Sequence, residues 1–420
     1  GTYLMGAAQF LFPEGNPELM EYCGRFAEEG LRVLVLAHSV NVSEGVELPE
    51  GLEPVGLLLI TDVIRAEAPD TLAYFESQGV DLKVISGDDP VTVSAIARRA
   101  GLKNAEHYID ATTITTQEQM DEAVAEYSVF GGVTPQQKQA MVKSLQAQKH
   151  TVAMTGDGVN DAPALKQADI GFAMGDGTAV AQEAGDVVIL NNSLTSIKDC
   201  VLNSRTMSKS VGKFLIFQLT VNISTLLMNI IAPILGWTEP FSIVQILWIN
   251  LIMDTLAAMA FGGEPILDRY MNEKPALRKD NILTTYIKSA IGTSSVFITL
   301  GSILILENIG GITDFVTPAG CADPELYEKT FMFAFFIYSI IFNSLNTRSE
   351  RFNVFEHIEE NKNFIIVMGV IFILQTIIIE IGGQVFSTTT LNAKALFVSM
   401  LLAVLIIPVD MVRKAIVSKK

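Results

Sequence analysis

The stretch MTGDGVNDAP, residues Met154 to Pro163, decides how this chain folds. It joins an apolar strand predicted over 151–154 to a helical run that begins at Ala162. Its two glycines let the backbone turn sharply and approach an anion, and Asp157 and Asp161, four residues apart, can hold a divalent cation beside it. Ligands of open α/β sheets bind at the carboxyl ends of strands, so the stretch predicts a Mg²⁺-phosphoryl site. The alternative is a tight turn with surface carboxylates.

Strand-like and helical runs alternate through the first half of the chain. The predicted strands span 31–37, 55–61, 82–86 and 151–154, and the predicted helices span 68–78, 91–100, 138–148 and 162–167. This alternation predicts a doubly wound α/β sheet with its functional groups at the strand carboxyl ends.

Further polar groups follow the predicted strands: Ser86-Gly87-Asp88, then Thr61-Asp62 with Arg65, and Lys138 at a helix start. A hydroxyl, a cation and carboxylates at converging strand ends are what phosphoryl transfer needs, because positive charge stabilises the phosphoryl oxygens and acids hold Mg²⁺. Taken singly, Ser86 could be a helix cap, Lys138 a solvated residue and Asp62 a turn former. Their joint occurrence favours function.

Composition divides the chain near residue 210. Beyond it, six apolar runs are each close to the ~20 residues that cross a bilayer, so we predict transmembrane helices at 214–235, 242–261, 287–306, 330–346, 364–381 and 394–412. The net charge of −17 argues against nucleic acid as a partner of the soluble half. The three cysteines, Cys23, Cys200 and Cys321, lie in three different regions and predict neither a disulfide framework nor a metal cluster.

Basic residues in the connections between spans predict the orientation. Alternate connections hold Lys and Arg, whereas 236–241, 307–328 and 383–393 hold neither. The positive-inside rule therefore predicts that the soluble half and the C-terminus are both cytoplasmic. The basic connections contain Arg205, Lys209, Lys213, Arg269, Lys274, Arg278, Lys279, Arg348, Arg351, Lys362, Arg413, Lys414, Lys419 and Lys420.

Polar side chains inside two spans predict an ion site. Asn250 and Asp254 are four residues apart and hence on one face of a regular helix, and Asn222 lies in the first span. Acids are rare in spans unless they face a cavity or a partner, and carboxylate and amide oxygens suit a hard cation such as Ca²⁺. The alternative is a hydrogen-bonded cluster between helices. Glu380 and Asp410 are predicted to be structural.

The soluble half resembles P-type cation-transporting ATPases, whose phosphorylation domain has the haloacid-dehalogenase-like fold. The residues that carry the resemblance are Thr155 to Pro163, Ser86-Gly87-Asp88, Asp62, Arg65 and Lys138. The resemblance implies that Asp157 and Asp161 serve the Mg²⁺ site with Gly156, Gly158 and Asn160, that Lys138 contacts phosphate, and that Arg32 reaches the phosphates of ATP. It also implies three regions: a nucleotide-domain remnant (1–48), a phosphorylation domain (49–205) and a membrane domain (206–420) containing pump helices five to ten.

Two departures from that family pattern stand out. Met5 occupies the place of a lysine near the family's adenine pocket, and no Asp-Lys-Thr-Gly-Thr occurs in the chain. Without the phosphorylated aspartate there is no covalent nucleophile, so the chain alone is expected to be inactive. The actuator domain and first four membrane helices of a pump are also missing. We therefore expect the C-terminal half of a pump whose partner is its N-terminal half.

In the membrane half, QILWINLIMDTL (245–256) resembles the sixth transmembrane helix of Ca²⁺-transporting ATPases, particularly the plasma-membrane type. The resemblance implies that Asn250, Asp254 and Asn222 bind the transported Ca²⁺ and that the pump lies in the plasma membrane. Thr225 stands where two-site pumps carry a glutamate, and the fourth span has no carboxylate, so one Ca²⁺ per cycle is expected.

Other functions remain open at this point. A P-type pump could carry Mn²⁺ or Na⁺ instead, and the chain could be a non-catalytic membrane protein with a regulatory role. A membrane-anchored phosphatase of the same fold is disfavoured because it also needs the missing aspartate.

Overall fold

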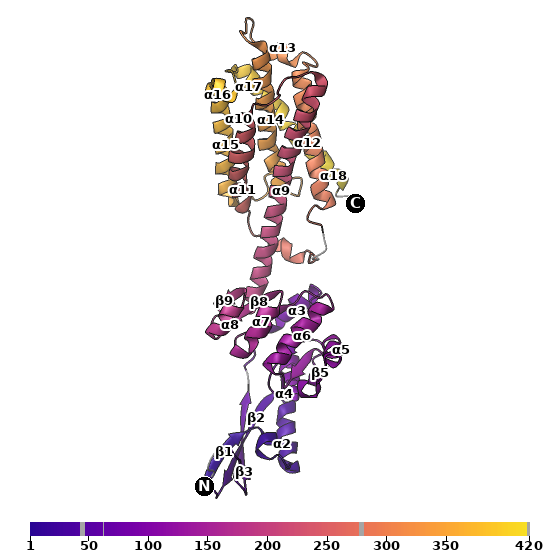
Figure 1. Cartoon of the computed structure of the whole chain (residues 1–420), viewed down its shortest axis with the longest axis vertical. Coiled ribbons are helices and arrows are strands. Elements are labelled where there is room, and N and C mark those ends of the chain that lie inside the picture. The colour runs from indigo at the N-terminus through magenta and orange to yellow at the C-terminus, as the bar shows by residue number, and fades with distance from the viewer. Residues whose placement is uncertain (43–46, 62, 277–280, 418–420) are drawn as a thin grey trace. The chain divides into compact units, whose positions relative to one another are not determined.

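The computed structural model describes residues 1–42, 47–61, 63–276 and 281–417. These residues form two compact units, Gly1–Cys200 and Val201–Lys420, which are described separately (Figure 1). Asp62, Arg278, Lys279, Lys419 and Lys420, all named above, lie outside the described residues.

The first sheet of the soluble unit is antiparallel. Its order is β1 (Thr2–Gly6), β2 (Leu31–Ser39) and β3 (Glu53–Thr61), and it packs with helices α1 (Ala8–Leu11) and α2 (Pro17–Glu28). Its core includes Leu19 and Val35, which are buried. The predicted strand 55–61 is therefore real, but its predicted place in the parallel sheet was wrong, because it pairs antiparallel with β2. The same sheet contains strands from both sides of the predicted boundary at residue 48.

The rest of the soluble unit is parallel α/β structure, as predicted, but divided into two sheets of three strands. One has the order β4 (Val84–Ile85), β6 (Val129–Gly131), β5 (Tyr108–Asp110), and the other β7 (Ala153–Gly156), β8 (Ile170–Met174), β9 (Val187–Ile189). The helices are α3 (Ala68–Ser77), α4 (Pro90–Arg99), α5 (Gln117–Glu126), α6 (Pro135–Ala147), α7 (Ala162–Gln167) and α8 (Ala179–Ala184).

Capping residues determine where the helices beside the strand ends begin. Asp89 accepts hydrogen bonds from the N–H groups of Val91 and Thr92 at the start of α4. Thr134 and Gln137 form a capping box at the start of α6, where Pro135 suits the first helical position. This cap places Lys138 in the first turns of α6, directly after the strand β6 and its loop.

The described residues contain six apolar helices long enough to cross a membrane, and all of them lie in the second unit except the start of the first helix, residues 195–200. They are α9 (Thr195–Leu235), the helix Ile243–Gly262, α12 (Thr285–Leu306), α14 (Pro324–Arg348), α15 (Lys362–Ile381) and the helix Ala393–Val417. The second span consists of α10 (Ile243–Leu247), a π-helical turn (Trp248–Met253) and α11 (Asp254–Gly262), and the sixth of α17 (Ala393–Val404) and α18 (Ile406–Val417). Short helices α13 (Ile312–Val316) and α16 (Gly383–Phe386) lie in connections. All six predicted spans are confirmed as apolar helices.

Helix α14 is the centre of this bundle. It contacts α12, α15, α17 and α18. In its most apolar stretch 89% of the residues are buried by the rest of the protein, against 28% in α15. The aromatic run Phe331 to Tyr338 is packed inside the bundle rather than exposed on its surface. In Figure 1 α14 runs alongside the other long helices of the unit. Burial on every side explains why this span tolerates several polar residues.

Candidate functional site

The side chain of Asp161 holds the loop after β7 in place. Lys138 Nζ lies 2.7 Å from Asp161 Oδ1, and Asp161 Oδ2 accepts the N–H groups of Asp157 (3.2 Å) and Gly158 (3.0 Å). A Cβ added at Gly156 would lie 2.5 Å from the Cβ of Asp161, so only glycine fits there. The buried carboxylate is thus committed to one cation and two backbone donors.

The two acids of the motif have different environments. The side chain of Asp157 is exposed and makes no hydrogen bond or ion pair among the described residues, while its C=O accepts from Thr178 N–H at 2.8 Å. Asn160 is exposed on the same loop. Asp157 therefore has both carboxylate oxygens free for a hard cation, whereas those of Asp161 are already engaged. The described residues contain no cluster of three or more His, Cys, Asp or Glu side chains.

The Ser86-Gly87-Asp88 turn forms a second group of predicted residues. Ser86 Oγ accepts Asp88 N–H at 3.2 Å, and the C=O groups of Ser86 and Asp88 accept the N–H groups of Val133 (3.0 Å) and Gly132 (2.8 Å). Arg32, on β2, brings Nη2 within 3.4 Å of Asp88 Oδ1, and both side chains are largely solvent-exposed. Within the described ranges, no hydrogen bond or ion pair joins this group to Lys138 or Asp157.

A glycine that sequence reasoning missed makes this turn possible. A Cβ at Gly131 would lie 2.3 Å from the Cα of Pro90, so β6 and the start of α4 can approach only because residue 131 has no side chain. The Gly131-Gly132 pair before the Thr134 cap was the available signal.

Arg65 is exposed, and within the described residues no hydrogen bond or ion pair joins it to either group. The pKa of Glu67 is lowered, first by a hydrogen bond to its own backbone and then by the hydroxyl of Ser193. The positive charge of Arg65 makes the smallest contribution to this lowering of the pKa. In this structure Arg65 therefore belongs to the turn before α3, where its C=O accepts Ala68 N–H.

Asp254 lies inside the second apolar span. It is 5% exposed, and its Oδ1 has no hydrogen-bond partner among the described residues. Thr225, on α9, is also buried with its Oγ1 unpaired, and Asn222 is half-buried one turn before it. Buried polar atoms without partners are costly, so these atoms are suited to receive a ligand. Phe217 and Phe261, 5.6 Å apart between ring centroids, pack α9 against α11.

Asn250 and Asp254 differ in their surroundings. Asn250 is exposed on the second unit, whereas Asp254 is buried. The prediction assumed a regular α-helix, but residues Trp248–Met253 form a π-helical turn just before Asp254. Trp248 Nε1 donates to Gln375 Oε1 at 3.0 Å and anchors this turn against α15. π-Helical turns occur frequently at functional sites.

Asp410 and Glu380, which were predicted to be structural, have different surroundings. Asp410 is buried between Arg413 (2.6 Å) and Lys414 (3.1 Å) of its own helix, which is a structural role. Glu380 is half-buried, and its C=O accepts the Thr390 hydroxyl.

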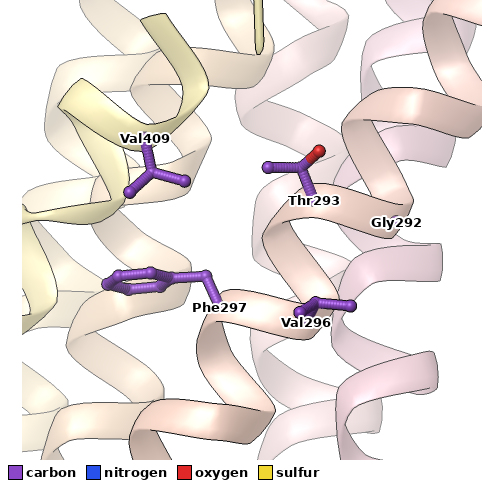
Figure 2. A pocket seen from close by; sticks show the side chains of 5 residues that line it. All are labelled: Gly292, Thr293, Val296, Phe297 and Val409. Atoms are coloured by element: carbon purple, nitrogen blue, oxygen red, sulfur yellow. The ribbon is translucent and has the colours of Figure 1, made fainter. Parts of the chain in front are cut away.

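A shallow groove of about 420 Å³ lies between α12 and α18 (Figure 2). It is lined by Gly292, Thr293, Val296, Phe297 and Val409, so it offers a hydrocarbon surface and no carboxylate. The groove is therefore not a site for an ion.

Each half of the chain matches a known protein family. Residues 238–416 match the family described as cation transporting ATPase, C-terminus, and residues 6–169 match haloacid dehalogenase-like hydrolase. Calcium-transporting ATPase 5, plasma membrane-type, of Oryza sativa subsp. japonica is 31% identical over 98% of this chain and 39% of its own length. Two relatives from Arabidopsis thaliana are also similar. Calcium-transporting ATPase 8, plasma membrane-type, is 32% identical over 92% of this chain and 38% of its own length. Putative calcium-transporting ATPase 13, plasma membrane-type, is 34% identical over 87% of this chain and 36% of its own length. The chain thus spans less than two fifths of these relatives.

Proposed function

Because the chain belongs to the cation-transporting ATPases, we propose that it is the C-terminal portion of a P-type pump that uses ATP to export Ca²⁺ across a membrane. The observation that carries the proposal is the pairing of two sites in one chain. One is the Lys138–Asp161 cluster with Asp157 beside it, and the other is the buried carboxylate of Asp254 in an apolar span, whose Oδ1 has no partner among the described residues.

The residues of the phosphoryl site have separate roles. Asp157 is the side chain that would hold Mg²⁺, which supplies charge neutralisation for the transferred phosphoryl group. Lys138 stabilises negative charge on that group, and Asp161 orients Lys138 and the loop that carries Asp157. Ser86 and Asp88 present a hydroxyl and a carboxylate at the end of β4, with Arg32 near enough to meet a phosphate of ATP.

The division of the parallel structure into two sheets supports a role for an upstream segment. β4 and β7 each end one three-stranded parallel sheet, and the predicted site residues follow both of these strands. An end strand has unpaired N–H and C=O groups that can accept another strand. We place the strand that carries the phosphorylated aspartate between β4 and β7, where it would complete one doubly wound sheet and bring its carboxylate to both groups. Without it, this chain incubated with ATP and Mg²⁺ should form no acyl phosphate.

The transported ion binds in the membrane unit. Asp254 supplies the carboxylate, Asn222 and Asn250 supply amide oxygens, and a glutamate from an upstream helix completes a shell of hard ligands. The exposure of Asn250 is consistent with a neighbour outside this chain that would cover it. Thr225 provides no carboxylate for a second site, so one Ca²⁺ per cycle is proposed.

The same residues leave alternatives that experiments can separate. Carboxylate and amide oxygens also accept Mn²⁺ or Na⁺, so ion competition decides the cargo. A chain made as it stands, without an upstream aspartate, would be a non-catalytic membrane protein, and the coding sequence upstream of Gly1 decides between that and a pump.

Six apolar helices make the protein an integral membrane protein. We propose the plasma membrane, as in the names of the relatives, with the soluble unit and the C-terminus in the cytoplasm where ATP is available. The distribution of Lys and Arg between the connections supports this orientation.

The test is Asp254→Asn in the complete pump, with Glu380→Gln as the matched control acid in another span. Asp254→Asn should abolish Ca²⁺-activated phosphorylation from labelled ATP, because it removes the carboxylate of the ion site, whereas Glu380→Gln should retain it. Normal Ca²⁺ activation of the Asp254→Asn pump would refute the assignment of the ion site.

A further inference from the structure

Glu264 lies just beyond the end of α11 and gathers polar groups from three other elements. Lys213 Nζ of α9 lies 2.5 Å from Glu264 Oε2, Arg348 Nε of α14 forms an ion pair with Oε1 at 3.0 Å, and Asn361 Nδ2 donates to Oε1 at 3.0 Å. The side chains of Lys213, Glu264 and Arg348 are only 8%, 5% and 2% exposed. Nothing in the proposed transport chemistry uses this cluster, which we call the Glu264 cluster.

The charges of the cluster do not balance. One carboxylate faces two cations, so the cluster carries one net positive charge in a buried site. Desolvating three charges costs several kcal/mol each, and their mutual attraction offsets this only while every partner is in place. Removing Glu264 would leave two buried cations facing each other, whereas removing Lys213 would leave the Arg348–Glu264 pair intact. The carboxylate is therefore the member on which the cluster depends.

Asn361 connects the cluster to the start of α15. Its Oδ1 accepts Phe364 N–H at 2.9 Å as the helix cap, and its Nδ2 also donates to Ala260 C=O at 3.2 Å. A Cβ at Gly263 would come within 3.1 Å of Asn361 Oδ1, so the chain between α11 and Glu264 packs closely on this cap. The cluster thus joins α9, α11, α14 and α15 at one level of the bundle.

The two helices that carry the proposed ion ligands meet at this cluster. Lys213 precedes Asn222 on α9, and Glu264 follows α11, the helix that begins at Asp254. At a rise of about 1.5 Å per residue, Asn222 and Asp254 each lie roughly 12–15 Å along their helices from the cluster. A shift of α9 relative to α11 at the cluster would change the separation of Asn222 and Asp254. We propose that Glu264 is a positioning residue that holds these two helices in register and so determines the affinity for the transported ion; this rests on the ion site proposed above.

The bundle contains a natural control for this idea. Asp410 is also a buried carboxylate between two cations, Arg413 and Lys414, with a side chain that is 3% exposed. All three of these residues belong to α18, so that cluster does not join α9 to α11. A general effect of losing a buried acid should appear at both places, whereas an effect on register should appear only at Glu264.

The experiment compares Glu264→Gln, Lys213→Met and Asp410→Asn in the complete pump. For each variant, the Ca²⁺ concentration for half-maximal phosphorylation and the maximal level are measured, with equilibrium binding of Ca²⁺ alone. Glu264→Gln should raise the half-maximal Ca²⁺ concentration by about tenfold and Lys213→Met by about threefold, with Asp410→Asn within about twofold of wild type.

An unchanged half-maximal Ca²⁺ concentration in folded Glu264→Gln, or an equal shift in Asp410→Asn, would overturn the proposal. Should Glu264→Gln fail to fold, Lys213→Arg against Lys213→Met gives the same test, because arginine retains the charge and should retain the affinity. A wild-type pump that Ca²⁺ does not activate would instead refute the proposed function, and with it this inference.

Discussion

Replacing Gly156 by alanine would test whether Asp161 really holds the loop after β7. The new Cβ would lie 2.5 Å from Asp161 Cβ, 2.7 Å from its Cγ and 2.9 Å from its Oδ2. Ordinary contact begins at 3.4 Å, so the side chain of Asp161 or the backbone must move by about 0.9 Å. That movement pulls the carboxylate away from Lys138 and from the N–H groups of Asp157 and Gly158.

The size of the effect follows from this displacement. Overpacking a tight site costs about 1–3 kcal/mol, and a misplacement near 1 Å in a catalytic site can reduce the rate about 100-fold. Gly158→Ala is the matched control, since its Cβ would meet Asp161 Oδ2 at 3.4 Å and Asn160 N at 3.8 Å, and its φ of −96° suits any residue.

Two measurements check the prediction. Hydrogen exchange of the full chain in detergent reports protection of the amides of Asp157 and Gly158, which Gly156→Ala should reduce and Gly158→Ala should reduce less. Phosphorylation of the complete pump should fall about 10- to 100-fold in the first variant and change little in the second. Equal effects of the two alanines, or unaltered protection in Gly156→Ala, would show that Asp161 does not control the loop.

Three further predictions concern other parts of the chain. Lys138→Met should slow phosphorylation of the complete pump by about 100-fold while Ca²⁺ binding is retained, and a loss of Ca²⁺ binding would contradict its assignment to the phosphoryl site. Thr225→Ala should leave equilibrium binding at one Ca²⁺ per active pump, and two bound ions in the wild type would disprove the single-site proposal. The Ser144 hydroxyl, and after it the Gln117 amide, lower the pKa of Asp121. These hydrogen bonds therefore stabilise the folded state above the unfolded-state pKa of Asp121. That stabilisation is lost as the pH falls through the folded-state pKa. Ser144→Ala should therefore lower the unfolding midpoint near neutral pH but not in acid, and a deficit independent of pH would argue against this linkage.

Local patterns predicted most of the elements. Apolar runs near 20 residues located all six spans, and strand–helix alternation located the parallel α/β structure, because both signals come from neighbouring residues. The partner of a strand is not local information, which is why β3 was placed in the wrong sheet and the division into two sheets was not foreseen.

The candidate site was predicted in composition more than in geometry. The motif identified Asp157, Asp161 and Lys138, but only the folded structure distinguishes the engaged carboxylate of Asp161 from the free one of Asp157. The π-helical turn that contains Asn250 was not predicted, because periodicity assumes 3.6 residues per turn. Glu264 was missed because its significance depends on cations that are far away in sequence.

The position of α14 has a consequence for how the protein is made. It is the least apolar of the six candidate spans, and its C-terminal half holds Asn343, Ser344, Asn346 and Thr347, all buried by other helices. During synthesis this segment leaves the ribosome before α15, α17 and α18 exist, with α12 already available. Ser294 of α12 donates to Asn343 Oδ1 at 3.0 Å, so the first helix to shelter these polar groups is also the preceding span. We therefore expect α14 to enter the bilayer as a hairpin with α12, and to be retained beside the insertion machinery until its later neighbours arrive.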